Sequence, residues 1–199
     1  MKGESLMKIN TRDMILISMF AALTAIGAQL RIPTEPIPFT LQVLFCMYSG
    51  ILLGSKKGAF SQILYVLLGL AGLPIFAEGN GGPSIIISPT FGYLLGFIAC
   101  AYVSGKITEN FKDVNIFKIA LATVSGLLVV YIVAVPYLYL ILTKVMNSPT
   151  TLNGVVKTGF LAFLGQDLVK CAIVSATSVL IIPALRKSGY LEVKKEAVH

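Results

Sequence analysis

Charged residues are scarce in this sequence. Asp, Glu, Lys and Arg make up 13% of the 199 residues, whereas hydrophobic residues make up 56%, and the mean hydropathy is +0.84. Soluble globular chains carry about 25% charged residues, which help to cover their surface with polar groups. A soluble fold of this length would lack that polar surface. The composition therefore predicts a single domain embedded in a lipid bilayer.

The residues and motifs of common catalytic and metal sites are also missing. The one histidine is His199, and the three cysteines, Cys46, Cys100 and Cys171, lie far apart within apolar stretches. This distribution predicts no metal site and three buried, unpaired thiols. The sequence contains no Gly-rich phosphate loop ending in Gly-Lys-Ser/Thr and no nucleophile elbow. We therefore expect that this chain is not an enzyme, does not hydrolyse ATP and holds no cofactor.

Six apolar segments are candidates for membrane-spanning helices, each of which needs about 20 mainly apolar residues. They cover approximately residues 13–30, 40–54, 58–71, 90–107, 116–142 and 159–185. The prediction is an all-α integral membrane protein: a six-transmembrane-helix bundle over residues 13–185, between an N-terminal segment (1–12) and a C-terminal tail (186–199). The second and third segments are short. They either span a thinned bilayer, continue into their flanks or form a re-entrant pair around a turn at 54–58.

The basic residues predict the orientation of this bundle. With the N-terminus inside, 12 of the 16 Lys and Arg residues fall in inner segments, and only Arg31, Lys144 and Lys157 fall in outer ones. Inner loops of membrane proteins are enriched in Lys and Arg, so we expect both termini to be cytoplasmic in a multi-pass protein of the cell membrane. The net charge of +7 then reflects contact with the bilayer, and no nucleic-acid partner is expected.

Two outer segments are rich in proline or glycine. Residues 31–39 contain three prolines, which hold a chain extended, and residues 72–89 contain several glycines, which permit tight turns. Both segments also carry many apolar side chains. We expect them to fold over a cavity at the outer face; the alternative is that they are ordinary connections.

Asp167 and Lys170 are the most informative residues, because both lie in an apolar segment. A charge in a bilayer costs at least about 2.5–3.5 kcal/mol, so such residues usually face the interior and have a function. Their spacing of three places them on one face of a helix. We interpret them as ligand-binding residues; the alternatives are a structural ion pair, or a helix end at which Lys170 reaches the membrane surface.

Further candidates flank the outer loops and line the first helix. Gln42 and Tyr93 follow the two loops, and Asn80 lies within the second one. Tyr93 would otherwise be an aromatic anchor at the membrane surface, and Asn80 would cap a turn. Small residues recur at a spacing of four in the first helix, in the pairs Ser18 with Ala22, Ala21 with Ala25, and Thr24 with Ala28. This spacing permits close approach of another helix, inside the protein or from a partner.

The sequence resembles the BioY family, the biotin-specific S-components of energy-coupling-factor (ECF) vitamin transporters. The resemblance covers nearly the whole chain, and the segment from Tyr65 through Gly69-Leu-Ala-Gly-Leu-Pro-Ile-Phe76 is its most specific part. Further matching segments are Pro38-Phe-Thr-Leu-Gln42, Gly50-Ile-Leu-Leu-Gly54 with Gly58, Gly81-Gly82, Gly92-Tyr93 and Asp167-Leu-Val-Lys170.

The resemblance implies a six-helix bundle that holds biotin near the outer face. It also implies a complex with a transmembrane coupling subunit and two cytoplasmic ATPase subunits, with Ala21 and Ala25 resembling the docking surface for the coupling subunit. Biotin suits the site, because Asp167 can accept from the two ureido N–H groups while Lys170 meets the carbonyl or the carboxylate. The alternative function is a self-sufficient secondary transporter of a small organic anion, with Asp167 as a proton relay.

Overall fold

The structure, a computed structural model, describes residues 10–35, 37–111 and 113–187. The predictions for residues 1–9 and 188–199, His199 included, lie outside the described residues. The elements are α1 (Thr11–Gln29), β1 (Arg31–Ile32), β2 (Phe39–Thr40), α2 (Gln42–Leu53), α3 (Ser55–Leu70), the 3₁₀ turns η1 (Ala77–Gly79) and η2 (Pro83–Ile87), α4 (Phe91–Glu109), α5 (Ile116–Leu140), the π turn η3 (Ile141–Val145), α6 (Leu152–Val156), the π turn η4 (Lys157–Leu161) and α7 (Ala162–Lys187).

Four helical runs in the described part of the chain are long and apolar enough to cross a membrane. They are Thr11–Gln29, Phe91–Glu109, Ile116–Val145 and Leu152–Leu185, with 19, 19, 30 and 34 residues. At 1.5 Å per residue the last two are about 45 and 51 Å long, which exceeds the bilayer's apolar core of about 30 Å. Helices α2 and α3 are shorter, with 12 and 16 residues. The prediction of an all-helical membrane domain is therefore confirmed, with four long helices and two short ones.

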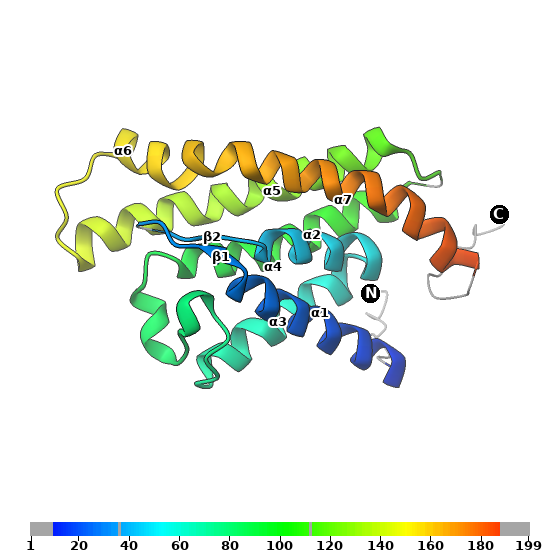
Figure 1. Cartoon of the computed structure of the whole chain (residues 1–199), viewed down its shortest axis with the longest axis horizontal. Helices are drawn as coiled ribbons and strands as arrows, with labels where there is room; N and C mark the ends of the chain where they lie inside the picture. Colours follow the sequence, from blue (N-terminus) through cyan, green and yellow to red (C-terminus); the bar gives the residue numbers. More distant parts are fainter. Residues whose placement is uncertain (1–9, 36, 112, 188–199) are drawn as a thin grey trace, which may run out of the picture.

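The connections between helices gather at two opposite ends of the molecule. Figure 1 places the first turn of α1, the α2–α3 connection, the α4–α5 connection and the last turn of α7 at one end, on the right. The β1–β2 hairpin, η1, η2 and the link between η3 and α6 lie at the other end. Helices α1 to α5 and α7 thus each run from one end toward the other.

Close packing of α2, α3 and α4 depends on glycines at their crossing points. A Cβ atom at Gly58 in α3 would lie 2.7 Å from the Cα of Gly50 in α2, and one at Gly105 in α4 would lie 2.7 Å from the carbonyl oxygen of Gly50. Because the obstructing atoms belong to the backbone, they cannot move aside as a side chain would. These glycines therefore set the distance between the three helices.

A buried polar cluster joins the first three helices. The amide of Gln62 in α3 donates to the hydroxyl oxygens of Thr24 in α1 and Ser49 in α2, both at 3.2 Å. All three residues are fully buried. Hydrogen bonds between membrane helices contribute about 0.6 kcal/mol each on average, so the cluster mainly specifies how these helices meet.

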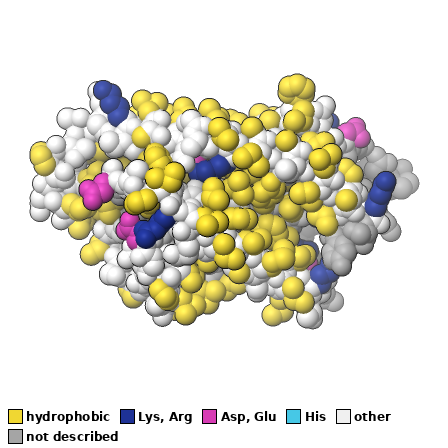
Figure 2. Space-filling model, viewed as in Figure 1, with side chains coloured by type: hydrophobic (Ala, Val, Ile, Leu, Met, Phe, Trp, Pro, Cys, Tyr) yellow, Lys and Arg dark blue, Asp and Glu magenta, His cyan; other side chains and the backbone are white. Residues whose placement is uncertain are grey.

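The outer surface is strongly apolar. Large hydrophobic side chains are exposed along the long helices, including Phe117, Ile132 and Leu180 at 80, 69 and 76%. Figure 2 shows hydrophobic side chains over the middle of one face, with charged side chains mainly toward its two ends. Soluble proteins rarely leave so much apolar surface uncovered, and this band is the part expected to contact lipid.

Two helix boundaries and one loop differ from the sequence prediction. The expected turn at 54–58 is reduced to Gly54, whose φ of 83° reverses the chain so that α3 begins at Ser55. The expected helix at 159–185 begins earlier, at Leu152, after a cap in which the Thr151 hydroxyl accepts from the N–H of Gly154. The first outer loop forms a short antiparallel hairpin, in which Arg31 pairs with Thr40.

Candidate functional site

A cavity lies inside the end of the bundle that carries the hairpin and the 3₁₀ turns. It contains about 580 Å³ of empty space, a volume that includes the open solvent at its mouth. Its walls come from the hairpin, the second outer loop, α2, α4, α5 and α7. The lining residues are Ile37, Pro38, Thr40, Gln42, Val43, Phe76, Ala77, Thr90, Tyr93, Leu94, Phe97, Val130, Phe163, Gln166, Asp167 and Lys170.

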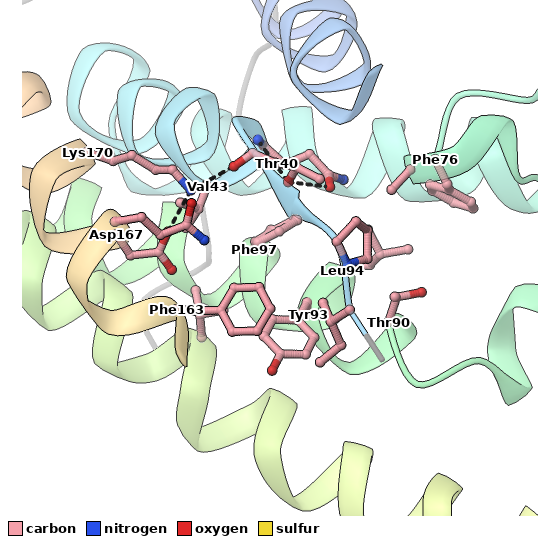
Figure 3. Close-up of a pocket in the computed structure, with 16 residues that line it drawn as sticks. Thr40, Val43, Phe76, Thr90, Tyr93, Leu94, Phe97, Phe163, Asp167 and Lys170 are labelled. Carbon is pink, nitrogen blue, oxygen red and sulfur yellow. Dashed lines mark hydrogen bonds and ion pairs between the residues drawn. The ribbon is translucent and has the colours of Figure 1, made fainter. Parts of the chain in front are cut away.

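Polar and apolar groups occupy different parts of this cavity. Figure 3 shows Asp167 and Lys170 together on one side, and Phe76 and Thr90 on the opposite side. The rings of Phe163 and Tyr93 lie between them, with centroids 6.3 Å apart. The arrangement suits a ligand with a flat or bicyclic apolar body and a polar group that reaches α7.

Asp167 and Lys170 face each other within one turn of α7, as the spacing predicts. The Lys170 Nζ atom lies 2.6 Å from Asp167 Oδ1, and each residue is only 6% exposed. Charges so far from water need a partner close by, and a nearby opposite charge provides it. The pair carries no net charge, which allows it to lie within an apolar bundle.

Two further contacts fix the pair to other elements. Tyr131 in α5 donates its hydroxyl to Asp167 Oδ2 at 2.6 Å, and Lys170 donates to the carbonyl oxygen of Thr40 in β2 at 2.7 Å. A carboxylate can accept about four hydrogen bonds and an ammonium group can donate three. Among the described residues, Asp167 and Lys170 have two partners each, so both retain capacity for a ligand.

The hairpin that covers the cavity is held at both sides. On the α7 side, Phe39 packs against Phe163 edge to face, with ring centroids 4.6 Å apart, and Thr40 holds Lys170. On the other side, Arg31 lies 3.3 Å from Glu78 in η1. The two outer loops therefore cover the cavity as the sequence predicts, and an ion pair links them.

Gln42 and Tyr93 line the cavity, as their positions after the outer loops suggest. Gln42 is buried; its amide donates to the Tyr65 hydroxyl at 2.8 Å and accepts from the Thr40 hydroxyl at 2.9 Å. Tyr93 is 9% exposed and donates to the carbonyl oxygen of Gly159 at 2.5 Å. Tyr93 thus faces the interior of the bundle, whereas an anchor at the membrane surface would face outward.

Asn80 lies outside the cavity lining. Its side chain is exposed and donates to the carbonyl oxygen of Ala77 at 3.1 Å. This bond closes a turn, which is the alternative that the sequence left open for this residue. A role for Asn80 in binding a ligand stays a prediction.

The small residues of α1 are divided between the interior and the surface. Ala21 is only 3% exposed and Ala25 is half-buried, whereas Ser18 and Ala22 are exposed. The pair predicted to dock a partner, Ala21 with Ala25, therefore lies mostly on the side of α1 that packs within this chain. Its docking role also stays a prediction.

The sequence reasoning did not identify Tyr131, Thr40, Gln166 or Phe163 as part of the site. Phe163 precedes Asp167 by four residues, and Gln166 is a third polar residue in the same stretch, so helical periodicity would have placed Phe163 on the face of Asp167. Tyr131 and Thr40 reach the charged pair from elements far away in the sequence. No local pattern marks them.

Comparisons with known proteins identify a family. The family model described as "BioY family" matches residues 2–187. The chain is 36% identical over 192 residues to a probable biotin transporter BioY of Lysinibacillus sphaericus, covering 95% of this chain and 97% of the relative. It is 37% identical over 184 residues to the biotin transporter BioY of Thermotoga maritima, covering 92% and 99%.

Solved structures show the same fold. A crystal structure of the S-component for biotin from an ECF-type ABC transporter matches with a TM-score of 0.75 and 26% identity, over 92% of this chain and 95% of that one. A structure of FolT bound with folic acid matches with a TM-score of 0.51 and 15% identity, over 94% of both chains. The second likeness is one of fold alone.

Proposed function

This chain belongs to the BioY family, and from that membership we propose that it is the biotin-binding membrane subunit, the S-component, of an ECF transporter. It captures biotin at the outer face of the cell membrane and delivers it for import. The chain performs no chemistry on biotin and needs no metal or cofactor for binding.

The observation that carries this proposal is the cavity around Asp167 and Lys170. Biotin offers a ureido ring with two N–H donors and a carbonyl oxygen, an apolar fused ring and a tail that ends in a carboxylate. Asp167 has acceptor capacity left for the ureido N–H groups, beyond its bonds to Tyr131 and Lys170. Lys170 retains one donor for either the carbonyl or the carboxylate, and the apolar walls accommodate the fused ring.

The other predicted ligand residues have different places in this proposal. Tyr93 lines the cavity and its hydroxyl is bonded to the Gly159 carbonyl oxygen, whereas Gln42 lines the cavity and is held by its bond to Tyr65. Asn80 would reach the ligand only if η1 moved, because its amide is engaged with Ala77.

The bundle crosses the membrane six times in this proposal, with both termini in the cytoplasm. The alternation of connections between two ends of the molecule supports six crossings, and the predominance of basic residues in the inner segments supports the orientation. Residues 13–185 then form the membrane domain, residues 1–12 and 186–199 are cytoplasmic, and the cavity opens outward.

Energy for transport comes from other chains, because this sequence contains no nucleotide-binding motif. The partners proposed are a transmembrane coupling subunit and two cytoplasmic ATPase subunits. The coupling subunit docks on α1, where Ala25 lies at the margin of the accessible face and Ala21 lies beneath it.

Binding and transport by the purified chain test the proposal. We expect the chain in mild detergent to bind one biotin per protein by titration calorimetry, and native mass spectrometry to show biotin retained after purification. In proteoliposomes, biotin accumulation should require co-reconstituted coupling and ATPase subunits together with ATP. Failure to bind biotin would refute the ligand assignment. Accumulation by the chain alone, driven by a proton gradient, would instead identify a secondary transporter.

A further inference from the structure

Gln166 differs from every other polar side chain in the cavity wall. It lies in α7 and lines the cavity, and its Nε2 atom is buried without a hydrogen-bond partner among the described residues. Asp167 and Lys170 hold each other, and Gln42 and Tyr93 are bound to Tyr65 and Gly159. The Thr90 hydroxyl is paired with that of Ser88 at 2.9 Å.

An unpaired amide in this place requires an explanation. Buried polar groups in proteins are nearly always hydrogen-bonded, so an exception beside a cavity points to a partner that arrives from outside. The amide nitrogen carries two N–H donors. The partner must therefore present an acceptor oxygen to the wall of the cavity formed by α7.

The neighbouring residue indicates which oxygen of the ligand this is. Gln166 and Asp167 are adjacent in α7 and both line the cavity, so the wall presents a donor beside an acceptor. A cyclic urea has the complementary pattern, with a carbonyl oxygen flanked by two N–H groups. A carboxylate tail offers acceptors only and would face Asp167 with like charge.

We propose that Gln166 is a specificity-determining residue, which donates a hydrogen bond from Nε2 to the ureido carbonyl oxygen of the ligand while Asp167 accepts from the ureido N–H groups. The inference rests on the proposed function, since it takes biotin as the ligand. It adds that the site selects ring systems whose carbonyl is a good acceptor. Within the described part of the chain, the Gln166 Nε2 atom makes no hydrogen bond that holds the fold together, so its contribution concerns binding.

Two substitutions of similar volume test the proposal by titration calorimetry with biotin on the purified full chain. Gln166→Leu removes the donors, and we expect biotin to bind about tenfold to a hundredfold more weakly. Gln166→Glu replaces the donors with acceptors and should weaken binding at least as much. Gln166→Leu should not lower the melting temperature, because the Nε2 atom has no hydrogen-bond partner among the described residues. Gln166→Glu places a second carboxylate beside buried Asp167 and should lower it. Unchanged biotin affinity in Gln166→Leu, or full affinity in Gln166→Glu, would overturn the donor role.

The matched control is Ser178→Ala. Ser178 also lies in α7, and its buried Oγ atom also has no partner among the described residues, but it is outside the cavity lining. We expect biotin affinity to stay within twofold of the wild-type value. A loss equal to that of Gln166→Leu would show that any unpaired polar group in α7 affects affinity indirectly, which would refute a direct contact.

Analogues of biotin test whether Gln166 donates to the ureido carbonyl oxygen or to the carboxylate. Biotin methyl ester keeps the ureido ring and masks the carboxylate, so the loss caused by Gln166→Leu should persist with the ester. In 2-thiobiotin a sulfur atom, which is a weak acceptor, replaces the carbonyl oxygen, so the loss should shrink. A loss that disappears with the ester would assign Gln166 to the carboxylate and overturn the proposal. Absence of biotin binding by the wild-type protein would instead refute the proposed function, so the two failures are distinguishable.

Discussion

At the scale of single residues, the site depends on how the charges of Asp167 and Lys170 are compensated. Each is 6% exposed, and each has one partner on another element besides the other member of the pair. An ion pair so arranged can serve the fold, the ligand or both. Substitutions that separate stability from binding therefore give the most information.

Asp167→Asn should weaken biotin binding by at least about a hundredfold, because the charged acceptor for the ureido N–H groups is lost. It should also destabilise the protein by about 3 kcal/mol, since Lys170 would remain buried without a counter-charge. Calorimetric titration and thermal unfolding measure the two effects. The double variant Asp167→Asn/Lys170→Met removes both charges and should recover stability but not binding. Recovery of both would show that the pair is purely structural.

Tyr131→Phe should have a smaller effect. The change removes only the hydroxyl that donates to Asp167 Oδ2, and a hydrogen bond to a charged group contributes about 1.5–3 kcal/mol. We expect biotin affinity to fall about tenfold, because the carboxylate loses the contact that orients it. Tyr139→Phe is the control, since the Tyr139 hydroxyl makes no hydrogen bond within the described residues and Tyr139 does not line the cavity. Equal effects in both variants would contradict the orienting role of Tyr131.

The sequence was sufficient to identify the charged pair but not its surroundings. Asp167 and Lys170 stand out because a charge in an apolar stretch needs an interior position, which is a local physical constraint. Tyr131 has no such signature, since its contact with Asp167 spans 36 residues of sequence. The same limit applies to Thr40, which acts through its backbone carbonyl group, a group that every residue type carries.

At the scale of helices, the length and apolarity of the segments predicted where the helices lie. They predicted less well the residues at which the helices begin and end. The start of α6 at Leu152 was missed because residues 150–158 are mainly polar or small, although Thr151 provides a helix cap. The turn between α2 and α3 was expected to take five residues, but the left-handed conformation of Gly54 completes it in one. The hairpin follows from the pairing of β1 with β2, which the hydropathy of the sequence does not display.

Gly58→Ala should disrupt the contact between α2 and α3. The added methyl group would lie 2.7 Å from both the Gly50 Cα atom and the Ser49 carbonyl oxygen, and overpacking of this kind costs about 1–3 kcal/mol. We expect a lower melting temperature in detergent.

Gly165→Ala is the matched control, because a Cβ atom there has nothing within 4 Å, and replacing glycine by alanine within a helix stabilises it by up to about 1 kcal/mol. A melting temperature that falls equally in both variants would argue against close packing at Gly58.

At the scale of the whole molecule, the charge pattern and the architecture agree on two distinct ends. The sequence predicted the orientation from counts of Lys and Arg, and the structure independently separates the connections of the chain into two groups. Neither observation alone shows whether the short helices α2 and α3 cross the bilayer. The side of the membrane on which their connection at Gly54 lies decides whether α2 and α3 cross the bilayer.

Labelling of introduced cysteines tests the topology. Lys56→Cys, beside the α2–α3 turn, should react with a membrane-impermeant maleimide only after cells are permeabilised, and Glu35→Cys in the hairpin should react in intact cells. Both positions are exposed, whereas Cys46, Cys100 and Cys171 are buried, so the unmodified protein serves as the unlabelled control. A re-entrant pair would leave the cysteine at position 56 unreactive from either side. Labelling at both positions in intact cells would contradict six crossings.

The hydrogen bond between Lys170 and Thr40 connects the proposed biotin site to the β1–β2 hairpin. The ammonium group that we propose to face the ligand also holds the hairpin in place through the Thr40 carbonyl oxygen, at 2.7 Å. We expect biotin to compete for that group, and hydrogen–deuterium exchange of the Phe39 and Thr40 amides to change on binding in the wild-type protein but not in Lys170→Met. Exchange that is insensitive to biotin would separate the hairpin from the site.

If biotin draws Lys170 away from Thr40, the bound and empty proteins should differ in the position of the hairpin. A ligand enclosed within the bundle does not itself alter the surface, but a displacement of Lys170 would reach the hairpin through the Thr40 carbonyl oxygen. The occupancy of the cavity would then alter the surface of the protein. Lys170 would then allow a partner protein to recognise from the hairpin's position whether the chain has biotin bound.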